Sequence, residues 1–449
     1  MKDLLQETLK RSLRYLESLP NRRVAPSPEA VDRLKELDYP LPDQPTEPKA
    51  VLRLLDDFGS PATVATTSGR FFGFVVGGSL PAAQAANWLA GAWDQNAGMF
   101  VLSPIGAALE QIALKWLTAL FGLPAGTGAG FVTGATMANF SGLAAARHAL
   151  LKKQGWDVES QGLFNAPPIT VVVGEEVHVS VLKALSLLGL GRDRVIRVPV
   201  DGQGRMRAEA FPQLSGPTIV CVQAGNVNTG AFDPAGPICA AARAADAWVH
   251  VDGAFGLWAA TTPQRSYLLT GFEKADSWAT DAHKWLNVPQ DSGLVFCRKP
   301  ELLRASMSAN AAYLVQTENR EPSQHVPEMS RRARGLEIWA ALLSLGQSGL
   351  ADMIERTCRH AERFATRLQK AGYEILNDVV LNQVLVSFGN DQKTLRVIEN
   401  LQAEGTCWCG ATTWQGRTAM RISISSWATT DQDVDRSLKA MLHIASLIK

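Results

Sequence analysis

The chain has 449 residues, of which 46% are hydrophobic and 19% are charged, a composition typical of a globular protein with more than one packed subdomain. Lys and Arg number 44 against 43 Asp and Glu, which leaves a net charge of +1. Because no basic excess is present, binding to nucleic acid or to an anionic membrane surface is not expected.

Six cysteines are spread along the chain, and their spacing fits neither a zinc site nor a CxxC redox motif. We therefore expect reduced thiols, no metal site and a cytoplasmic enzyme. Charged residues occupy the first turns, so no signal peptide is expected there, and no apolar run is long enough to span a membrane. Four leucines at helical spacing instead predict an amphipathic helix that ends before Pro20. These leucines are Leu5, Leu9, Leu13 and Leu16.

In chain order, residues 1–62 are expected to form this helix and a Pro- and charge-rich arm that follows it. Helical spacing then covers residues 82–120 with a break at 96–104, and residues 136–154 predict a helix that Thr136 can cap. Short apolar runs alternate with helical segments after that: strands at 169–173, 218–222, 248–251, 277–280 and 294–297, and helices at 181–190 and 237–245. This alternation predicts an α/β domain over residues 63–333, with a mostly parallel sheet covered by helices on both faces.

After about residue 334 the pattern changes. Two long helical stretches, residues 335–349 and 352–371, precede strand-like segments at 380–388 and 420–424. This order predicts a smaller α+β domain over residues 334–449.

Two residues at predicted strand ends indicate a chemistry. Sites in open parallel sheets form at the carboxyl ends of strands. Lys284 follows the strand at 277–280, and an amine whose charge is opposed by burial can form an imine with an aldehyde. Asp252 ends the strand at 248–251, and a carboxylate there can keep the ring nitrogen of a pyridoxal cofactor protonated. Taken singly, a surface lysine and a structural cap are the alternatives.

Two further strand ends carry weaker signals. The small residues 133–136 enter the helix at 136–154, and N–H groups with a hydroxyl at a helix N-terminus can hold a phosphate. The preceding glycines do not complete GxGxxG, because Phe131 occupies the sixth position, so a dinucleotide site is poorly supported. His178 follows the strand at 169–173 and can stack on a cofactor ring, although a structural histidine is equally consistent.

Together these residues resemble the pyridoxal-dependent (group II) amino-acid decarboxylase family, which includes aromatic amino-acid and glutamate decarboxylases. The match is strongest at residues 281–285, Asp-Ala-His-Lys-Trp, which are similar to the family's (Asn/Asp)-(Pro/Ala)-His-Lys signature. The resemblance runs from about residue 60 to about residue 430. Its other motifs lie at residues 70–81, 134–136, 178, 228–233, 250–254 and 331–339.

The resemblance implies an aspartate-aminotransferase-like fold (fold type I) and pyridoxal 5′-phosphate (PLP) as cofactor. It implies that Lys284 holds PLP as a Schiff base, that Asp252 pairs with the ring nitrogen and that His178 stacks on the ring. It also implies a homodimer with the site at the subunit interface. The other residues expected around the cofactor and its phosphate are Ala135, Thr136, His283 and Ala254.

The implied reaction is decarboxylation of an L-amino acid. The substrate amine would displace Lys284 to form an external aldimine, and the protonated ring would delocalise the electrons left by CO2 in a quinonoid. A general acid would then protonate Cα, and Lys284 would release the amine product. An aminotransferase or an oxidative, aldehyde-forming activity on the same cofactor is the alternative.

Two departures from the family pattern bear on this reaction. Many family decarboxylases carry a loop tyrosine that delivers the proton to Cα, and none lies between Tyr313 and Arg331. His325 is the only obvious proton carrier in that stretch, with a solvated loop histidine as the alternative. Asp281 stands where some members carry Asn, and a carboxylate near a phosphate is unfavourable unless it is paired or points away, so we expect a supporting role for it.

Substrate contacts are expected from Phe71, Phe74 and Arg421. The two aromatic residues can line an aromatic pocket or belong to the core. Arg421 can clamp the α-carboxylate of the substrate or form a structural ion pair. Because Arg70 can favour an acidic side chain, the sequence does not decide between aromatic and acidic substrates.

Overall fold

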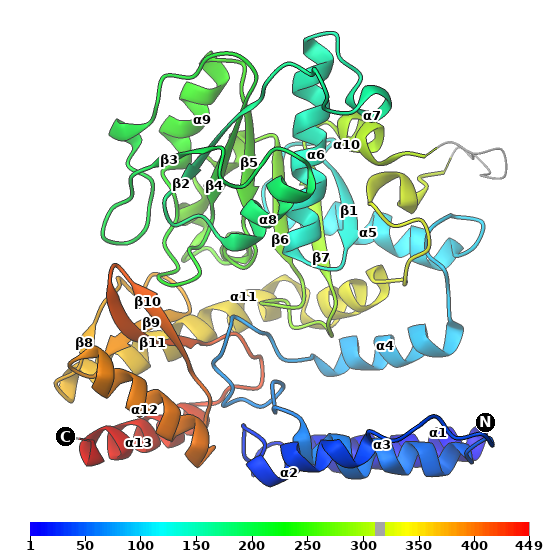
Figure 1. Ribbon diagram of the computed structural model, residues 1–449, viewed down its shortest axis with the longest axis vertical. Coiled ribbons are helices and arrows are strands. Elements are labelled where there is room, and N and C mark those ends of the chain that lie inside the picture. Colours follow the sequence, from blue (N-terminus) through cyan, green and yellow to red (C-terminus); the bar gives the residue numbers. More distant parts are fainter. Residues whose placement is uncertain (310–318, 449) are drawn as a thin grey trace. The chain divides into compact units, whose positions relative to one another are not determined.

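The computed structural model describes residues 1–309 and 319–448 (Figure 1). The chain packs as two compact units. Unit 1 comprises Met1–Gly78, His360–Leu376 and Val384–Lys449, and unit 2 comprises Ser79–Arg359 and Asn377–Gln383. The expected N-terminal arm, residues 1–62, lies within unit 1.

Unit 2 is built on a central sheet whose strands, within the described residues, are β1 (Gly128–Val132), β2 (Thr170–Gly174), β3 (Val195–Val198), β4 (Thr218–Gln223), β5 (Trp248–Asp252), β6 (Ser277–Asp281) and β7 (Gly293–Cys297). Their spatial order is β1-β7-β6-β5-β4-β2-β3. The strands from β3 to β6 pair in parallel, while β7 is antiparallel to both β6 and β1. β1 therefore points the same way as β6, and the expected mostly parallel sheet is confirmed.

Helices cover both faces of this sheet, as Figure 1 shows. Among the described residues, the α-helices that lie wholly in unit 2 are α4 (Pro81–Trp93), α5 (Pro104–Leu120), α6 (Ala135–Lys153), α7 (Val158–Gln161), α8 (Val179–Leu187), α9 (Ala235–Ala244) and α10 (Pro300–Met307). α6, α8 and α10 bury one face in a cluster of apolar side chains that includes Leu143, Val171 and Val295. On the opposite face Trp278 donates its indole N–H to the carbonyl of Phe272. This covered, mostly parallel sheet is the fold type I arrangement that the sequence predicted.

The start of α6 differs from the prediction. The helix begins at Ala135 and has Gly134 at its N-cap without a side-chain cap, so Thr136 lies inside the first turn and does not cap the helix. β1, directly before it, was not delimited as a strand from the sequence. Its Gly-Ala-Gly beginning has little intrinsic strand preference, and the strand forms because it pairs with β7 along its whole length.

Unit 1 contains a small sheet with the order β10-β11-β9-β8. Its elements are α1 (Lys2–Ser18), α2 (Pro28–Asp32), α3 (Pro48–Ala62), β8 (Glu374–Ile375), β9 (Gln383–Ser387), α12 (Asp391–Glu404), β10 (Gly410–Trp414), β11 (Arg417–Ser423) and α13 (Asp431–Leu447). β10 is antiparallel to β11, and β8 is antiparallel to β9. α12 packs on β11 and on α13. This is the small α+β arrangement expected near the C-terminus.

Two helices, α11 and α1, can be compared with the helices that the hydrophobic spacing of the sequence predicted. α11 (Gly335–Lys370) contains one non-helical residue, Gly346, at φ +60°. The predicted pair of helices is therefore present, and its break lies at this glycine. α1 is the predicted amphipathic helix, although the four leucines of the predicted face remain 42–57% exposed in the single chain. No helix in the described ranges has both the length and the apolarity needed to cross a membrane.

Candidate active site

The predicted site residues of unit 2 gather at one edge of its sheet. β1, β2, β5 and β6 point in the same direction, so the segments that follow them leave the sheet at the same edge. Thr136 follows β1, His178 follows β2, Asp252 ends β5 and Lys284 follows β6. Residues from four separate strand ends therefore meet in one region of the fold.

Lys284 forms an ion pair at the end of β6. Its Nζ lies 2.8 Å from Asp281 Oδ2. The other oxygen, Asp281 Oδ1, accepts a hydrogen bond of 2.5 Å from the backbone N–H of Ala135. Asp281 is 2% exposed, so both of its oxygens are partnered away from water. This carboxylate ties the lysine-bearing turn to the first residue of α6.

His283 is held beside this pair as a hydrogen-bond donor. The backbone N–H of Ser292 donates to His283 Nδ1 at 3.0 Å, so the ring proton lies on Nε2, which is 3.7 Å from Asp281 Oδ1. Burial lowers the pKa of His283, and the nearby Asp281 carboxylate opposes that shift. A Cβ added to Gly134 would lie 3.2 Å from His283 Cε1, which shows how closely the turn before α6 packs on this ring.

The start of α6 is rich in hydrogen-bond donors. The N-cap residue Gly134 has no side chain to cap the helix, and the first-turn N–H groups, of which that of Ala135 donates to Asp281, carry the positive end of the helix dipole. Thr136 adds a half-buried hydroxyl in the same turn. These groups and His283 Nε2 are donors of the kind that bind a phosphate. The donor set therefore fits the phosphate of PLP.

Asp252 is held by hydrogen bonds to both of its oxygens. The backbone N–H of Ala254 donates to Oδ1 at 3.2 Å, and Asn139 Nδ2 donates to Oδ2 at 3.3 Å. The residue is 5% exposed. A carboxylate fixed in this way suits the ring nitrogen of a pyridoxal cofactor. Ala254 contributes through its backbone.

His178 stands at the N-cap of α8. Its Nδ1 accepts from the backbone N–H of Ser180 at 3.2 Å and lies 2.8 Å from Ser180 Oγ. Ser180 Oγ in turn accepts from Asn139 Nδ2 at 3.1 Å. Asn139 therefore contacts both Asp252 and the partner of His178. Sequence reasoning assigned no role to Asn139 or Ser180, although Asn139 lies one helical turn behind Ala135 and so near the same edge.

His325 does not have the surroundings of a proton donor. It ends the short 3₁₀ helix η6 (Pro322–His325), which packs over Gly130 in the middle of β1. It is 9% exposed, and burial, reinforced by Arg320, lowers its pKa to about 3. Within the described residues no hydrogen bond or ion pair joins it to Lys284 or Asp252. A buried neutral imidazole holds no acidic proton near neutral pH, so these surroundings disfavour His325 as the proton donor, and its catalytic role stays an untested prediction. Tyr313 lies outside the described residues.

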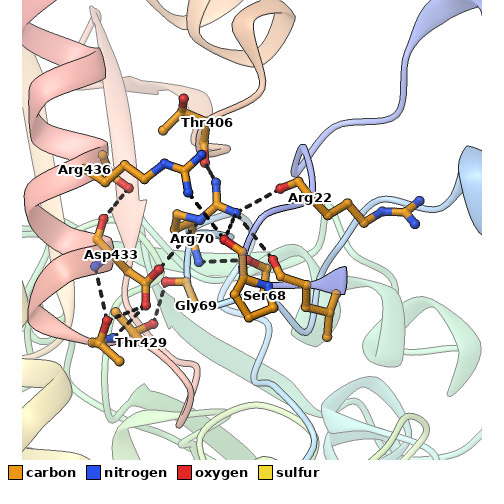
Figure 2. A network of polar contacts seen from close by, with 12 residues as sticks. Arg22, Ser68, Gly69, Arg70, Thr406, Thr429, Asp433 and Arg436 are labelled. Carbon is orange, nitrogen blue, oxygen red and sulfur yellow. Dashed lines mark hydrogen bonds and ion pairs between the residues drawn. The ribbon is translucent and has the colours of Figure 1, made fainter. Parts of the chain in front are cut away.

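Arg70 is a buried structural residue of unit 1 (Figure 2). Its guanidinium donates to the backbone carbonyls of Leu19, Pro20, Arg22 and Thr406. Its Nε lies 3.6 Å from Asp433 Oδ1. All of these partners belong to unit 1. The expectation that Arg70 favours an acidic substrate is therefore wrong, because its side chain is 0% exposed and is surrounded by main-chain acceptors.

The three expected substrate residues also belong to unit 1. Phe74 is 65% exposed, has φ +56° and stacks on Trp408 with ring centroids 5.3 Å apart. Phe71 stacks on the same indole and is 3% exposed. Arg421 lies in β11, where burial lowers its pKa. Their contact with substrate stays a prediction.

Known proteins resemble this chain along most of its length. The family model described as the pyridoxal-dependent decarboxylase conserved domain matches residues 28–389. The chain belongs to this family. It is a PLP-dependent amino-acid decarboxylase, as its motifs predicted.

Individual relatives are distant but extensive. The chain is 27% identical over 349 residues to aromatic-L-amino-acid decarboxylase of Bacillus atrophaeus, covering 75% of this chain and 70% of that protein. It is 28% identical over 361 residues to acidic amino acid decarboxylase GADL1 of Homo sapiens, covering 77% and 68%. The crystal structure of Oryza sativa TDC with PLP and tryptamine superposes with a TM-score of 0.91 at 22% identity, covering 100% of this chain and 98% of that one. This superposition confirms fold type I.

Proposed function

We propose that this decarboxylase binds PLP at the sheet edge of unit 2, with Lys284 as the residue that carries the cofactor. Asp252 faces the ring nitrogen and His178 the ring. The first turn of α6 and His283 bind the phosphate. The observation that supports this arrangement is the meeting of an amine, a fixed carboxylate and a donor-rich helix start at one edge.

Each group has a task that follows from its surroundings. PLP, when bound, supplies the electron sink that lets an amino acid lose CO2. Lys284 must leave its ion pair with Asp281 before its amine can act as a nucleophile, because a protonated amine has no free electron pair. Asp252 holds a proton on the ring nitrogen, and His283 donates from Nε2.

The proposed substrate class depends on whether Arg70 is available to bind an acidic side chain. Arg70, the residue that suggested an acidic substrate, donates to main-chain carbonyls and is fully buried. Phe74 is exposed and stacks on Trp408. We therefore propose an L-amino acid with an apolar or aromatic side chain, and contact of this substrate with Phe71, Phe74 or Arg421 stays a prediction from the sequence.

The test begins with an absorbance spectrum of the purified protein, with and without borohydride, alongside Lys284→Ala. A visible cofactor band that borohydride removes and that the variant lacks supports Lys284. Release of CO2 and amine is then measured over a panel of aromatic, aliphatic and acidic amino acids. Turnover of the acidic members alone contradicts the proposed substrate class.

The segment 314–330 contains no tyrosine, and this favours an oxidative, aldehyde-forming reaction as the second candidate activity. A carbanion that is not protonated quickly can react with oxygen, and the products are then aldehyde, ammonia and peroxide. The same assay separates the two activities, because decarboxylation releases amine without consuming oxygen. A keto acid as product indicates an aminotransferase.

We also propose that the protein is a cytoplasmic homodimer. Large apolar side chains of α4 are exposed in the single chain, as are the leucines of α1, and a second copy of the chain would cover such surface. The exposed residues of α4 are Trp88, Leu89 and Trp93. All six cysteines lie within the described residues, are buried and form no disulfide there, which suits a reducing compartment. Light scattering on the purified protein should give twice the mass of 48.5 kDa of one chain.

A further inference from the structure

A chain of buried side chains leads from Asp252 into the interior of unit 2. Asn139 Nδ2 donates to Asp252 Oδ2 at 3.3 Å, and His250 Nε2 lies 2.9 Å from Asn139 Oδ1. His250 Nδ1 lies 2.8 Å from Ser277 Oγ, which also accepts the indole N–H of Trp248 at 2.9 Å. Asn139, His250 and Ser277 are each 0% exposed. These contacts link β6, β5 and α6 to one carboxylate.

The proton positions along this series of hydrogen bonds follow from Asp252, which can only accept. A carboxylate accepts only, so Asn139 must turn its amide N–H toward Asp252 and its carbonyl toward His250. His250 Nε2 must then carry a proton. Burial lowers the pKa of His250 to about 3, so the ring is neutral and Nδ1 accepts from the Ser277 hydroxyl. Every donor in the chain therefore points toward Asp252.

A branch of the same chain leads to His178. The second amide hydrogen of Asn139 points to Ser180 Oγ at 3.1 Å, and Ser180 lies against His178 Nδ1. Because the Ser180 backbone N–H also points at Nδ1, the ring proton of neutral His178 lies on Nε2. One amide therefore orients both Asp252 and His178.

The packing around His250 is shaped to this arrangement. A Cβ added to Gly142 would lie 2.7 Å from His250 Cε1, so only glycine on α6 leaves room for the ring. Trp248, His250 and Asp252 occupy every second position of β5, so their three side chains lie on the same face of the strand. Ser277 completes the contact from the first residue of β6.

We propose that Asn139, His250 and Ser277 form a positioning relay that sets the protonation of the PLP ring nitrogen through Asp252. The inference rests on the proposed function, because it requires Asp252 at that nitrogen. Hydrogen bonds that all donate in one direction reinforce one another in a dry interior and stabilise negative charge at the acceptor end. Because these hydrogen bonds stabilise the ionised form of Asp252, the shared proton stays on the ring nitrogen and does not move to the carboxylate.

The experiment reads the ring nitrogen directly. Holoenzyme reconstituted with PLP labelled with ¹⁵N in the ring is examined by NMR, and the dissociation constant of PLP is measured in parallel. Asn139→Leu and His250→Phe should shift the ring nitrogen toward its deprotonated signal. They should also weaken PLP binding about ten-fold or more, the scale of losing a hydrogen bond to a charged group. Ser277→Ala should act in the same direction and more weakly.

Three matched variants show whether the effect belongs to the relay. Ser277→Thr keeps the hydroxyl and should restore the wild-type signal. Ser141→Ala removes a buried hydroxyl of α6 that bonds to the carbonyl of Met137 outside the relay, and should leave both readouts unchanged. Ser180→Ala breaks the branch to His178 and should leave the ring nitrogen protonated. If Asn139→Leu and His250→Phe disturb folding, the comparison of Ser277→Ala with Ser277→Thr still tests the relay.

The outcomes separate the relay from the proposed function. If Asp252→Asn deprotonates the ring nitrogen while the Asn139, His250 and Ser277 variants match wild type, the relay is overturned and the role of Asp252 stands. If Asp252→Asn also changes nothing, Asp252 is not the partner of the ring nitrogen, and the relay fails with it. A graded response, strongest at Asp252 and weakest at Ser277, supports the relay.

Discussion

Lys284 Nζ lies 2.8 Å from Asp281 Oδ2, so the amine and the carboxylate of the signature segment form an ion pair. Asp281 has a second partner in the N–H of Ala135, the residue that opens α6. The carboxylate thus holds both the reactive amine and one donor of the phosphate-binding turn.

Replacing Asp281 by Asn should make PLP binding faster and tighter. The amide keeps an acceptor for Ala135, removes a negative charge from the region of the phosphate and no longer pairs with the ammonium of Lys284. We expect a several-fold lower dissociation constant, measured by the growth of the visible band when apoprotein is mixed with PLP. Weaker binding would show that the carboxylate helps to hold the cofactor.

Replacing Gly293 by Ala should damage the phosphate-binding turn. A Cβ at this position would lie 2.5 Å from Gly134 Cα, and backbone atoms cannot yield as a side-chain tip can. We expect PLP affinity to fall by at least ten-fold, with a lower melting temperature. Gly236→Ala is the control: it lies in α9 with open space around the added methyl, and alanine favours a helix over glycine by about 1 kcal/mol. Equal effects of the two substitutions would contradict the close approach.

Replacing Arg70 by Met should destabilise unit 1 without changing substrate preference. The substitution leaves the carbonyls of four residues without their buried donor, at a cost on the order of 3 kcal/mol of unfolding free energy. Arg363→Ala breaks partly exposed ion pairs with Asp431 and Asp435 and should cost about 1 kcal/mol or less. Urea denaturation compares the two. A stable Arg70→Met protein with altered turnover of acidic substrates would indicate that Arg70 contacts the substrate.

Acid should destabilise the protein partly through its buried histidines. The pKa of His325 falls to about 3 in the folded chain, so below about pH 6.5 the unfolded state binds a proton that the folded state does not. Its contribution to stability is complete above that pH and is lost as the pH falls toward 3. Between pH 7.5 and pH 5 this amounts to about 2 kcal/mol.

His325→Gln should remove this part of the pH dependence. Glutamine can still donate to the carbonyl of Glu321, the one hydrogen bond found for the His325 ring within the described residues. The difference between the melting temperatures at pH 7.5 and pH 5 should therefore be smaller in the variant. A variant with the same difference as wild type would mean that His325 is already exposed to protons in the folded chain. Activity should survive the substitution, because the imidazole is packed over β1.

Local pattern was sufficient for five strands of the large sheet, β2, β4, β5, β6 and β7, and for its mostly parallel character, whereas β1 and β3 were not predicted. Apolar runs of strand length alternate with helical spacing, and that information lies within short windows of sequence. The prediction of Lys284 and Asp252 as site residues rests on the cost of placing an amine and a carboxylate after buried strands without a chemical purpose. Errors concern local details whose cause is distant, such as β1, which depends on pairing with β7.

The sequence by itself determined the cofactor class and the fold, and it predicted the residues of the site. Tertiary structure decided which side chains touch. Asn139 reaches Asp252 across 113 residues of chain, and Arg70 reaches the carbonyl of Thr406 across 336. His325 changed from an exposed loop residue to a buried neutral one because η6 packs on β1. Such contacts join segments that no local periodicity relates, and the desolvation they cause sets the charge and hydrogen-bonding role of each group.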